Sequence, residues 1–230
     1  MRLQPIYDIA EICSRKGLVN AILCPGSRCA PLTLAFTRHP KITARTFSDE
    51  RSAGFIALGM AQQSGSPTVM ICTSGTAAYN FAPSVAEAYF SQTPLIVFTA
   101  DRPAEWIAQH DGQTIYQSEI FGKHVKKSFQ LPQEYEHADI QWAINRIVND
   151  SINLSLEEPQ GPVHINAPFR EPLYPEAKEK FDFSKEVRVM DQLPPQYSLS
   201  PEHLQKLIQD WSKHTKILIV AGQHEYDNAL

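Results

Sequence analysis

Two arginines each follow a short apolar run that is typical of a buried strand. The first lies in Cys24-Pro25-Gly26-Ser27-Arg28 and the second in Thr99-Ala100-Asp101-Arg102-Pro103. Proline and glycine favour a tight turn in the first segment, which presents Ser27 and Arg28 beyond it. An arginine guanidinium binds a carboxylate or a phosphate through two parallel hydrogen bonds. Each segment alone is explained as well by an ordinary surface loop with an exposed arginine.

A carboxylate follows another apolar run, in Phe47-Ser48-Asp49-Glu50-Arg51. This pattern places Glu50 at a strand–helix junction, before a predicted helix that is rich in alanine and glycine. An acidic residue in the first turn of a helix commonly does no more than complement the helix dipole. From the residues alone, that simpler interpretation of Glu50 is favoured.

A glycine flanked by hydroxyl groups follows a third run, in Thr73-Ser74-Gly75-Thr76-Ala77. Gly75 would let the backbone approach a ligand closely, whereas Ser74 or Thr76 could equally cap a helix. A polar loop that contains Gln113 follows the fourth run. The sequence has neither a GxxxxGK[ST] nor a GxGxxG phosphate-binding motif.

Alternation of apolar runs with helical patterns predicts how these segments come together. Several runs are continuously apolar, so both faces of those strands must be covered, as in a parallel sheet. We predict an α/β doubly wound fold, a six-stranded parallel sheet with helices on both faces. The predicted strands are 18–23, 42–47, 68–73, 95–99, 125–129 and 162–166, and the predicted helices are 7–16, 31–37, 51–63, 76–91 and 137–156. Ligands bind at the carboxyl ends of such strands, so the segments above favour a site for a small anionic ligand.

Composition and charge argue against several classes of protein. The chain has 230 residues, is 43% hydrophobic and 20% charged, and carries a net charge of -4, which is ordinary for a globular protein. Scattered lysines and arginines argue against nucleic-acid binding, and no apolar run of about 18 residues predicts a membrane span. The amino terminus lacks the apolar core of a signal peptide. The four cysteines form no CxxC pair, so we expect free thiols in a reducing cytoplasm.

The character of the sequence changes after residue 168. Prolines and charged residues between 170 and 200 predict an extended connector on the surface. Ser200 as N-cap and Pro201 in the first turn predict a helix over 202–211, followed by a strand over 216–220. A strand that lacks neighbours and covering helices indicates that the chain stops early in a second domain.

The order and spacing of these segments resemble one family of thiamine-diphosphate enzymes, the synthases of 2-succinyl-5-enolpyruvyl-6-hydroxy-3-cyclohexene-1-carboxylate in menaquinone synthesis. The resemblance covers essentially the whole chain and includes residues 161–166 and 171–174. Many thiamine-diphosphate enzymes share the strand-end glutamate and the Thr-Ser-Gly turn. The Ser-Arg pair after Pro-Gly, joined to Asp-Arg-Pro, narrows the resemblance to this family. One departure is Gly112-Gln113, where the family usually has Asn-Gln.

The resemblance implies thiamine diphosphate as the cofactor, with Mg²⁺ or Mn²⁺ as its metal. Pro25, Glu50, Thr73, Ser74 and Gly75 would bind the cofactor. Glu50 would be the catalytic residue, hydrogen-bonded to the aminopyrimidine ring. It would need to stay protonated near neutral pH, which a buried apolar site favours.

The implied reaction joins decarboxylated 2-oxoglutarate, as a succinyl carbanion equivalent, to isochorismate with release of CO₂. Ser27, Arg28, Arg102 and Gln113 would bind the substrates. The resemblance further implies a cytoplasmic homodimer or homotetramer without nucleic acid or a membrane span.

Three domains are implied for the complete enzyme. Residues 1–175 would be the pyrimidine-binding domain, 176–199 a linker, and 200–230 the truncated start of a central domain. The diphosphate-binding domain, which holds the metal, would be missing, so we expect no metal ligands in this chain and no activity from it alone.

Two alternatives stay open. Another thiamine-dependent carboligase, similar to acetolactate synthase, would keep Glu50 and the glycine turn but gives no reason for the pair of arginines. A free-standing α/β ligand-binding module would need a finished carboxyl terminus, which the predicted strand over 216–220 argues against.

Overall fold

The computed structural model describes residues 3–176, 182–183, 186–193, 195, 198–220 and 222. The chain forms two compact units, Met1–Gln192 and Leu193–Leu230. Each unit is described by itself below.

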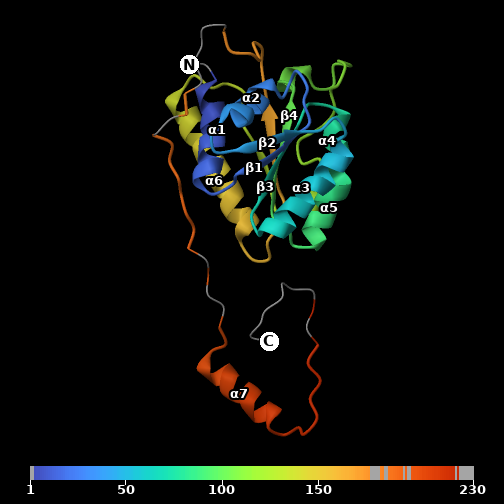
Figure 1. Cartoon of the computed structure of the whole chain (residues 1–230), viewed down its shortest axis with the longest axis vertical. Helices are drawn as coiled ribbons and strands as arrows, with labels where there is room; N and C mark the ends of the chain where they lie inside the picture. Colours follow the sequence, from blue (N-terminus) through green and yellow to red (C-terminus); the bar gives the residue numbers. More distant parts are fainter. Residues whose placement is uncertain are drawn as a thin grey trace. The chain divides into compact units, whose positions relative to one another are not determined.

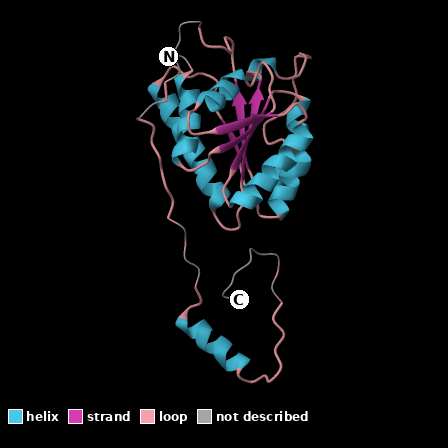
Figure 2. Cartoon of the chain, viewed as in Figure 1, coloured by secondary structure: helices cyan, strands magenta, loops and turns pink. Residues whose placement is uncertain are grey.

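A six-stranded sheet lies at the centre of the first unit (Figures 1 and 2), and all of its strand pairs are parallel. The strand order is β2-β1-β3-β4-β6-β5, and parallel pairing places the carboxyl ends of the strands at one edge. The predicted fold class is therefore confirmed. The strands are β1 (Asn20–Leu23), β2 (Thr43–Thr46), β3 (Thr68–Cys72), β4 (Leu95–Asp101), β5 (Ser128–Gln130) and β6 (Val163–Pro168).

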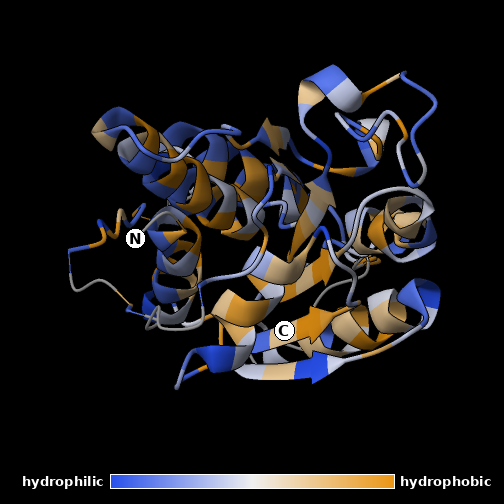
Figure 3. Ribbon diagram, turned by 90° about the horizontal axis from the view of Figure 1, so that it is seen from above, coloured by the Kyte–Doolittle hydropathy of each residue, from blue (hydrophilic) through white to orange (hydrophobic). Residues whose placement is uncertain are grey.

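Helices cover both faces of this sheet (Figure 1). One face carries α1 (Gln4–Arg15), α2 (Ala30–Arg38) and α6 (Ala138–Leu156), and the other carries α3 (Glu50–Ser64), α4 (Thr76–Asn80) and α5 (Ala82–Phe90). Each face has its own apolar core, and Figure 3 shows hydrophobic residues concentrated along the strands. Two short 3-10 helices, η1 (Ala104–Trp106) and η2 (Gly122–His124), lie between β4 and β5.

Helix α3 extends one residue beyond each end of the helix predicted over 51–63. The carboxylate of Asp49 caps the helix by accepting a hydrogen bond from the backbone N–H of Ser52 at 2.7 Å. Gly65 ends the helix in a left-handed conformation, with φ of 62°. Within the helix, a side chain at Gly54 would collide with Ser84, whose Cβ would lie 2.9 Å from the added carbon. The small residues therefore allow α3 to pack closely against α5.

Some predicted element bounds are wrong. The helix predicted over 76–91 is two helices, because Pro83 in the first turn of α5 has no N–H to continue the hydrogen bonding from α4. The strand predicted over 125–129 lies at Ser128–Gln130, because its pairing with β6 begins at Ser128.

Part of the predicted connector packs on helices α1 and α6. The side-chain amide of Asn149 in α6 donates to the carbonyl of Arg188 at 2.8 Å, and its oxygen accepts from the backbone N–H of Met190 at 2.7 Å. Lys16 after α1 donates to the carbonyl of Met190 at 3.0 Å and pairs with Asp191 at 2.9 Å. These bonds tie residues 188–191 to the first unit.

The second unit contains helix α7 (Pro201–Trp211), which Ser200 caps by accepting from the backbone N–H of His203 at 3.2 Å. Its apolar side chains, including Leu204, Leu207 and Ile208, are exposed. The strand predicted over 216–220 is wrong, because these residues form no strand and pair with none of the strands in the described part of the chain. None of the helices described is long and apolar enough to cross a membrane.

Truncation of Phe98 should show how much the apolar core between the sheet and α2 contributes to the free energy of unfolding. The ring of Phe98 on β4 is fully buried and lies 6.2 Å from the ring of Phe36 on α2. Phe98→Ala should lower the free energy of unfolding by about 3–5 kcal/mol, because it leaves a cavity between the sheet and the helix. The matched control is Phe90→Ala, since Phe90 is 73% exposed, and we expect it to cost less than about 1 kcal/mol. Denaturant unfolding measures both, and equal losses would contradict this description of the core.

Candidate functional site

A polar cavity of about 410 Å³ opens at the carboxyl ends of β1 and β3. Segments that are far apart in the sequence meet there, namely the turn after β1, the start of α3, the turn after β3 with helix α4, and the polar loop after β4. The lining residues are Pro25, Gly26, Ser27, Glu50, Thr73, Ser74, Thr76, Ala77, Asn80 and Gln113. This is the edge of the sheet where a doubly wound fold binds its ligands.

Most of the residues predicted for the site line this cavity together. Pro25, Ser27, Glu50, Thr73, Ser74 and Gln113 all do so, although they come from four separate segments. Gly75 lies directly behind the lining, where a side chain on it would approach the backbone of Gln113 to 3.1 Å. Arg28 and Arg102 do not line this cavity.

Two glycines let the cavity walls come together. A side chain at Gly26 would lie 2.5 Å from Cβ of Thr73, so the turn after β1 packs directly on the turn after β3. Gly75 adopts φ of 91° and ψ of -147°, a conformation that is essentially restricted to glycine. The backbone of both turns is thereby brought close to the space that a ligand would fill.

The hydroxyl group of Ser74 is the clearest sign that this cavity binds something. Ser74 is buried, and its Oγ has no hydrogen-bond partner among the described residues. A buried hydroxyl without a partner costs free energy unless a ligand or water satisfies it. The lining therefore fits a ligand with hydrogen-bonding groups.

Glu50 begins α3 at the rim of the cavity and is partly exposed in this chain. The buried apolar surroundings expected for this carboxyl group are therefore not formed by the residues that the structure describes, because the helix N-terminus lies at the open edge of the sheet. Glu50 nevertheless lies near the buried cysteines at the ends of β1 and β3, Cys24 and Cys72. Burial raises the pKa of the Cys24 thiol to about 12, and the charge of Glu50 adds to the rise.

Arg28 is buried beside the cavity and is held by a backbone carbonyl. Its Nη1 donates to the carbonyl of Phe169 at 2.8 Å, and its Nη2 lies 3.9 Å from a carboxylate oxygen of Glu171. Burial and the nearby charge of Arg102 lower the pKa of Arg28, while Glu171 acts in the opposite direction. The two predicted arginines are therefore close enough to repel each other.

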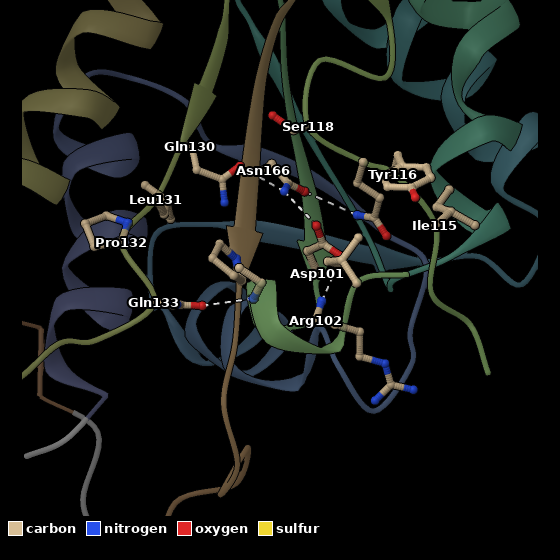
Figure 4. A pocket seen from close by; sticks show the side chains of 14 residues that line it. Asp101, Arg102, Ile115, Tyr116, Ser118, Gln130, Leu131, Pro132, Gln133 and Asn166 are labelled. Carbon is tan, nitrogen blue, oxygen red and sulfur yellow. Dashed lines mark hydrogen bonds between the residues drawn. The ribbon is translucent and has the colours of Figure 1, made fainter. Parts of the chain in front are cut away.

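Arg102 lies at the rim of a second cavity of about 430 Å³, formed at the ends of β4, β5 and β6. Figure 4 shows its guanidinium turned away from the buried polar side chains of that cavity. The Nη2 atom donates to the carbonyl of Gly112 at 2.9 Å, and Nε lies 3.3 Å from the carboxylate of Asp111. Arg102 thus holds the polar loop that brings Gln113 to the first cavity.

Buried polar side chains of the second cavity form a hydrogen-bond network (Figure 4). The side chain of Gln117 accepts from the backbone N–H of Gly75 at 2.7 Å and donates to the carbonyl of Ala100 and to Asn166. Asn166 in turn donates to Asp101 at 2.8 Å. Burial raises the pKa of Asp101, while the hydrogen bond from Asn166 and the nearby arginines lower it.

Prediction from the sequence missed some lining residues. Thr76, Ala77 and Asn80 all lie on α4, and Asn80 follows Thr76 by four residues, so both face the cavity from one side of the helix. That spacing is a signal that could have been used. Gln117 was also missed, because nothing in its neighbours along the chain indicates its distant partners.

No metal site accompanies the cavity in the part of the chain that the structure describes. No group of three or more His, Cys, Asp or Glu side chains there could hold a metal ion. The four cysteines are free and buried.

Comparison with known proteins finds the family that the sequence resembles. Residues 7–120 match the family described as thiamine pyrophosphate enzyme, N-terminal TPP binding domain. A 2-succinyl-5-enolpyruvyl-6-hydroxy-3-cyclohexene-1-carboxylate synthase of Cytophaga hutchinsonii is 52% identical over 99% of the chain and 40% of that relative. Synthases with the same name from Phocaeicola vulgatus and Desulfotalea psychrophila are each 39% identical, over 95% and 99% of the chain. The chain spans 38–42% of the length of these relatives.

Gly26→Ala should test the close contact between the two turns of the cavity. The added methyl group overlaps Thr73, so the substitution should lower the free energy of unfolding by about 1–3 kcal/mol. In a Thr73→Gly background the same substitution should cost at least about 1 kcal/mol less. Gly59→Ala is the control, since a methyl group there meets no atom within 4 Å, and it should stabilise α3 by up to about 1 kcal/mol. If Gly26→Ala costs the same free energy of unfolding in both backgrounds, the two turns do not touch as described.

Proposed function

We propose that this chain, which belongs to the thiamine pyrophosphate enzymes, is the pyrimidine-binding part of a 2-succinyl-5-enolpyruvyl-6-hydroxy-3-cyclohexene-1-carboxylate synthase of menaquinone biosynthesis. The complete enzyme would join decarboxylated 2-oxoglutarate to isochorismate and release CO₂. The observation that carries the proposal is the cavity that combines Glu50, the turn of residues 73–75 and Gln113 at the carboxyl edge of the sheet. The common name of the relatives gives the product of the reaction, and the two substrates are part of our proposal.

The residues of the cavity fit the pyrimidine half of thiamine diphosphate. Ser74 offers a buried hydroxyl that lacks a partner among the described residues, and Gly26 and Gly75 let the turns after β1 and β3 and the loop with Gln113 pack closely around the cavity. Pro25 and Thr73 would complete the wall against that ring. When bound, thiamine diphosphate supplies a nucleophilic carbon and a cationic ring that takes up the electron pair released on decarboxylation.

Glu50 would act on the cofactor rather than on a substrate. Its carboxyl group stands at the rim of the cavity, at the first position of α3, and would hydrogen-bond a ring nitrogen of the aminopyrimidine. A carboxyl group can share or release a proton at that nitrogen, which is general acid–base catalysis through the cofactor. Glu50 is partly exposed in this chain, so a further part of the enzyme would have to cover it in the complete site.

Arg28, Arg102, Ser27 and Gln113 would bind the two substrates, both of which carry carboxylates. The two guanidinium groups lie near each other beside the cavity, and the charge of Arg102 lowers the pKa of Arg28. Two close cations favour a ligand with more than one negative charge. Gln113 lines the cavity and could donate its amide to a substrate oxygen.

Further parts of the assignment follow from the family. We propose residues 1–175 as the pyrimidine-binding domain, 176–199 as a linker and 200–230 as the start of a central domain. The diphosphate would be held with Mg²⁺ or Mn²⁺ by another domain, in a cytoplasmic homodimer or homotetramer.

Glu50→Gln should abolish most of the synthase activity of the complete enzyme. The amide cannot share or release a proton at the cofactor nitrogen, so we expect the turnover number to fall by about 100-fold or more. Glu87→Gln on the exposed face of α5 is the matched control and should leave turnover unchanged. Steady-state formation of the product measures both variants. Normal turnover in Glu50→Gln would exclude this role.

Arg28→Ala and Arg102→Ala should weaken substrate binding more than cofactor binding. Loss of one charge-assisted hydrogen bond costs about 1.5–3 kcal/mol, so the apparent KM for at least one substrate should rise by about 10-fold to 150-fold. Arg146→Ala, on the exposed side of α6, is the control. Titration with 2-oxoglutarate, isochorismate and thiamine diphosphate separates the effects. A large loss of thiamine diphosphate affinity with normal substrate KM values would contradict the assignment.

A further inference from the structure

We propose that Gln117 is a positioning residue that fixes the cofactor turn, residues 73–75, against the substrate-binding loop, residues 104–121. The proposal rests on the proposed function of the cavity, to which both segments contribute. Gln117 itself lines the second cavity and does not touch the first.

The side-chain amide of Gln117 joins three segments at once. Its oxygen accepts from the backbone N–H of Gly75 at 2.7 Å. Its nitrogen donates to the carbonyl of Ala100 at 3.0 Å and to the amide oxygen of Asn166 at 3.2 Å. Gln117 is 1% exposed, so water cannot take over these bonds. The turn after β3 is thereby tied to the ends of β4 and β6.

Gly75 depends on this bond more than an ordinary turn residue would. Its φ of 91° and ψ of -147° are available to glycine alone, the residue whose backbone has the greatest freedom, so hydrogen bonds are needed to hold this conformation. Its N–H is buried and needs a partner to avoid the cost of desolvation. The acceptor that the structure supplies is the oxygen of Gln117. Without this bond, the turn that carries Thr73 and Ser74 would no longer be hydrogen-bonded, through Gln117, to the ends of β4 and β6.

The loop that carries Gln117 has a backbone conformation that is unfavourable at several residues. Ala108, His110, Gln113 and Glu119 all have positive φ values, between 56° and 61°. Such values cost about 1 kcal/mol for residues other than glycine, so the loop keeps them because bonds elsewhere fix its course. Gln117 is the buried anchor nearest to Gln113. One side chain thus sets where Gln113 stands relative to the cofactor turn.

Hydrogen exchange of the Gly75 amide tests this placement without cofactor, substrate or any activity. In the unmodified chain, the Gly75 amide should exchange much more slowly than that of the exposed Gly112. Gln117→Met keeps the volume of the side chain but removes its acceptor, and should speed exchange at Gly75 by about 10-fold. Gln133→Met is the matched control, because Gln133 lines the same second cavity but accepts from Ala104 at 3.2 Å instead.

Kinetics of the complete enzyme then separate positioning from mere support of the fold. If Gln117 places the cofactor turn, Gln117→Met should raise the half-saturating concentration of thiamine diphosphate by about 10-fold relative to Gln133→Met. A residue that only supports the fold would lower the amount of active enzyme and leave that concentration unchanged.

The exchange and kinetic results test the role of Gln117 and the proposed function separately. Fast exchange at Gly75 in the unmodified chain would overturn the proposal, even if the variants do not fold. Equal exchange or equal cofactor dependence in Gln117→Met and Gln133→Met would also overturn it. Absence of any thiamine-dependent reaction in the unmodified complete enzyme would instead refute the proposed function. The exchange experiment would still show whether Gln117 holds the Gly75 amide.

Discussion

The site depends on one buried amide, the side chain of Asn166 at the carboxyl end of β6. Its oxygen accepts from Thr99 at 2.9 Å and from Gln117 at 3.2 Å, and its nitrogen donates to Asp101 at 2.8 Å and to Gln130 at 3.0 Å. Every hydrogen-bonding position of the amide is therefore used. Because these partners lie on β4, on β5 and in the loop after β4, this amide aligns the ends of β4, β5 and β6 with the loop that carries Gln113 and Gln117.

The fold was predictable because both signals on which it rests are local. Continuous apolar runs such as those of β3 and β4 indicated buried parallel strands, and the alternation with helices indicated the layers. The errors arose where a local pattern depends on a distant partner. Residues 216–220 look like a strand but pair with none of the strands described, and Pro83 divides a pattern that otherwise continues as one helix. The connector was predicted from prolines and charges, but not its bonds to Asn149.

The cavity was predictable to the extent that its residues stand at strand ends. Glu50, Ser74 and Gln113 could be assigned to one edge of a parallel sheet, and the resemblance to a family supplied their roles. Gln117 could not be found in this way, because its importance comes from three partners that are 17 to 49 residues distant along the chain. A glutamine in a polar loop gives no local indication that it is buried.

The two arginines bear on how a substrate could gain binding energy at this site. Each already has one nitrogen committed to a backbone carbonyl, of Phe169 or of Gly112, so the direction of each fork is set before any ligand arrives. Each also stands near a carboxylate, Glu171 or Asp111, and the side chain of Glu171 is 77% exposed. A substrate carboxylate would exchange with these groups rather than pair with a free cation. Displacing the exposed Glu171, 3.9 Å from Arg28, would cost less than displacing the partly buried Asp111, 3.3 Å from Arg102. The arginines would then contribute chiefly through the fixed direction of their forks, which favours substrates whose carboxylates match that spacing.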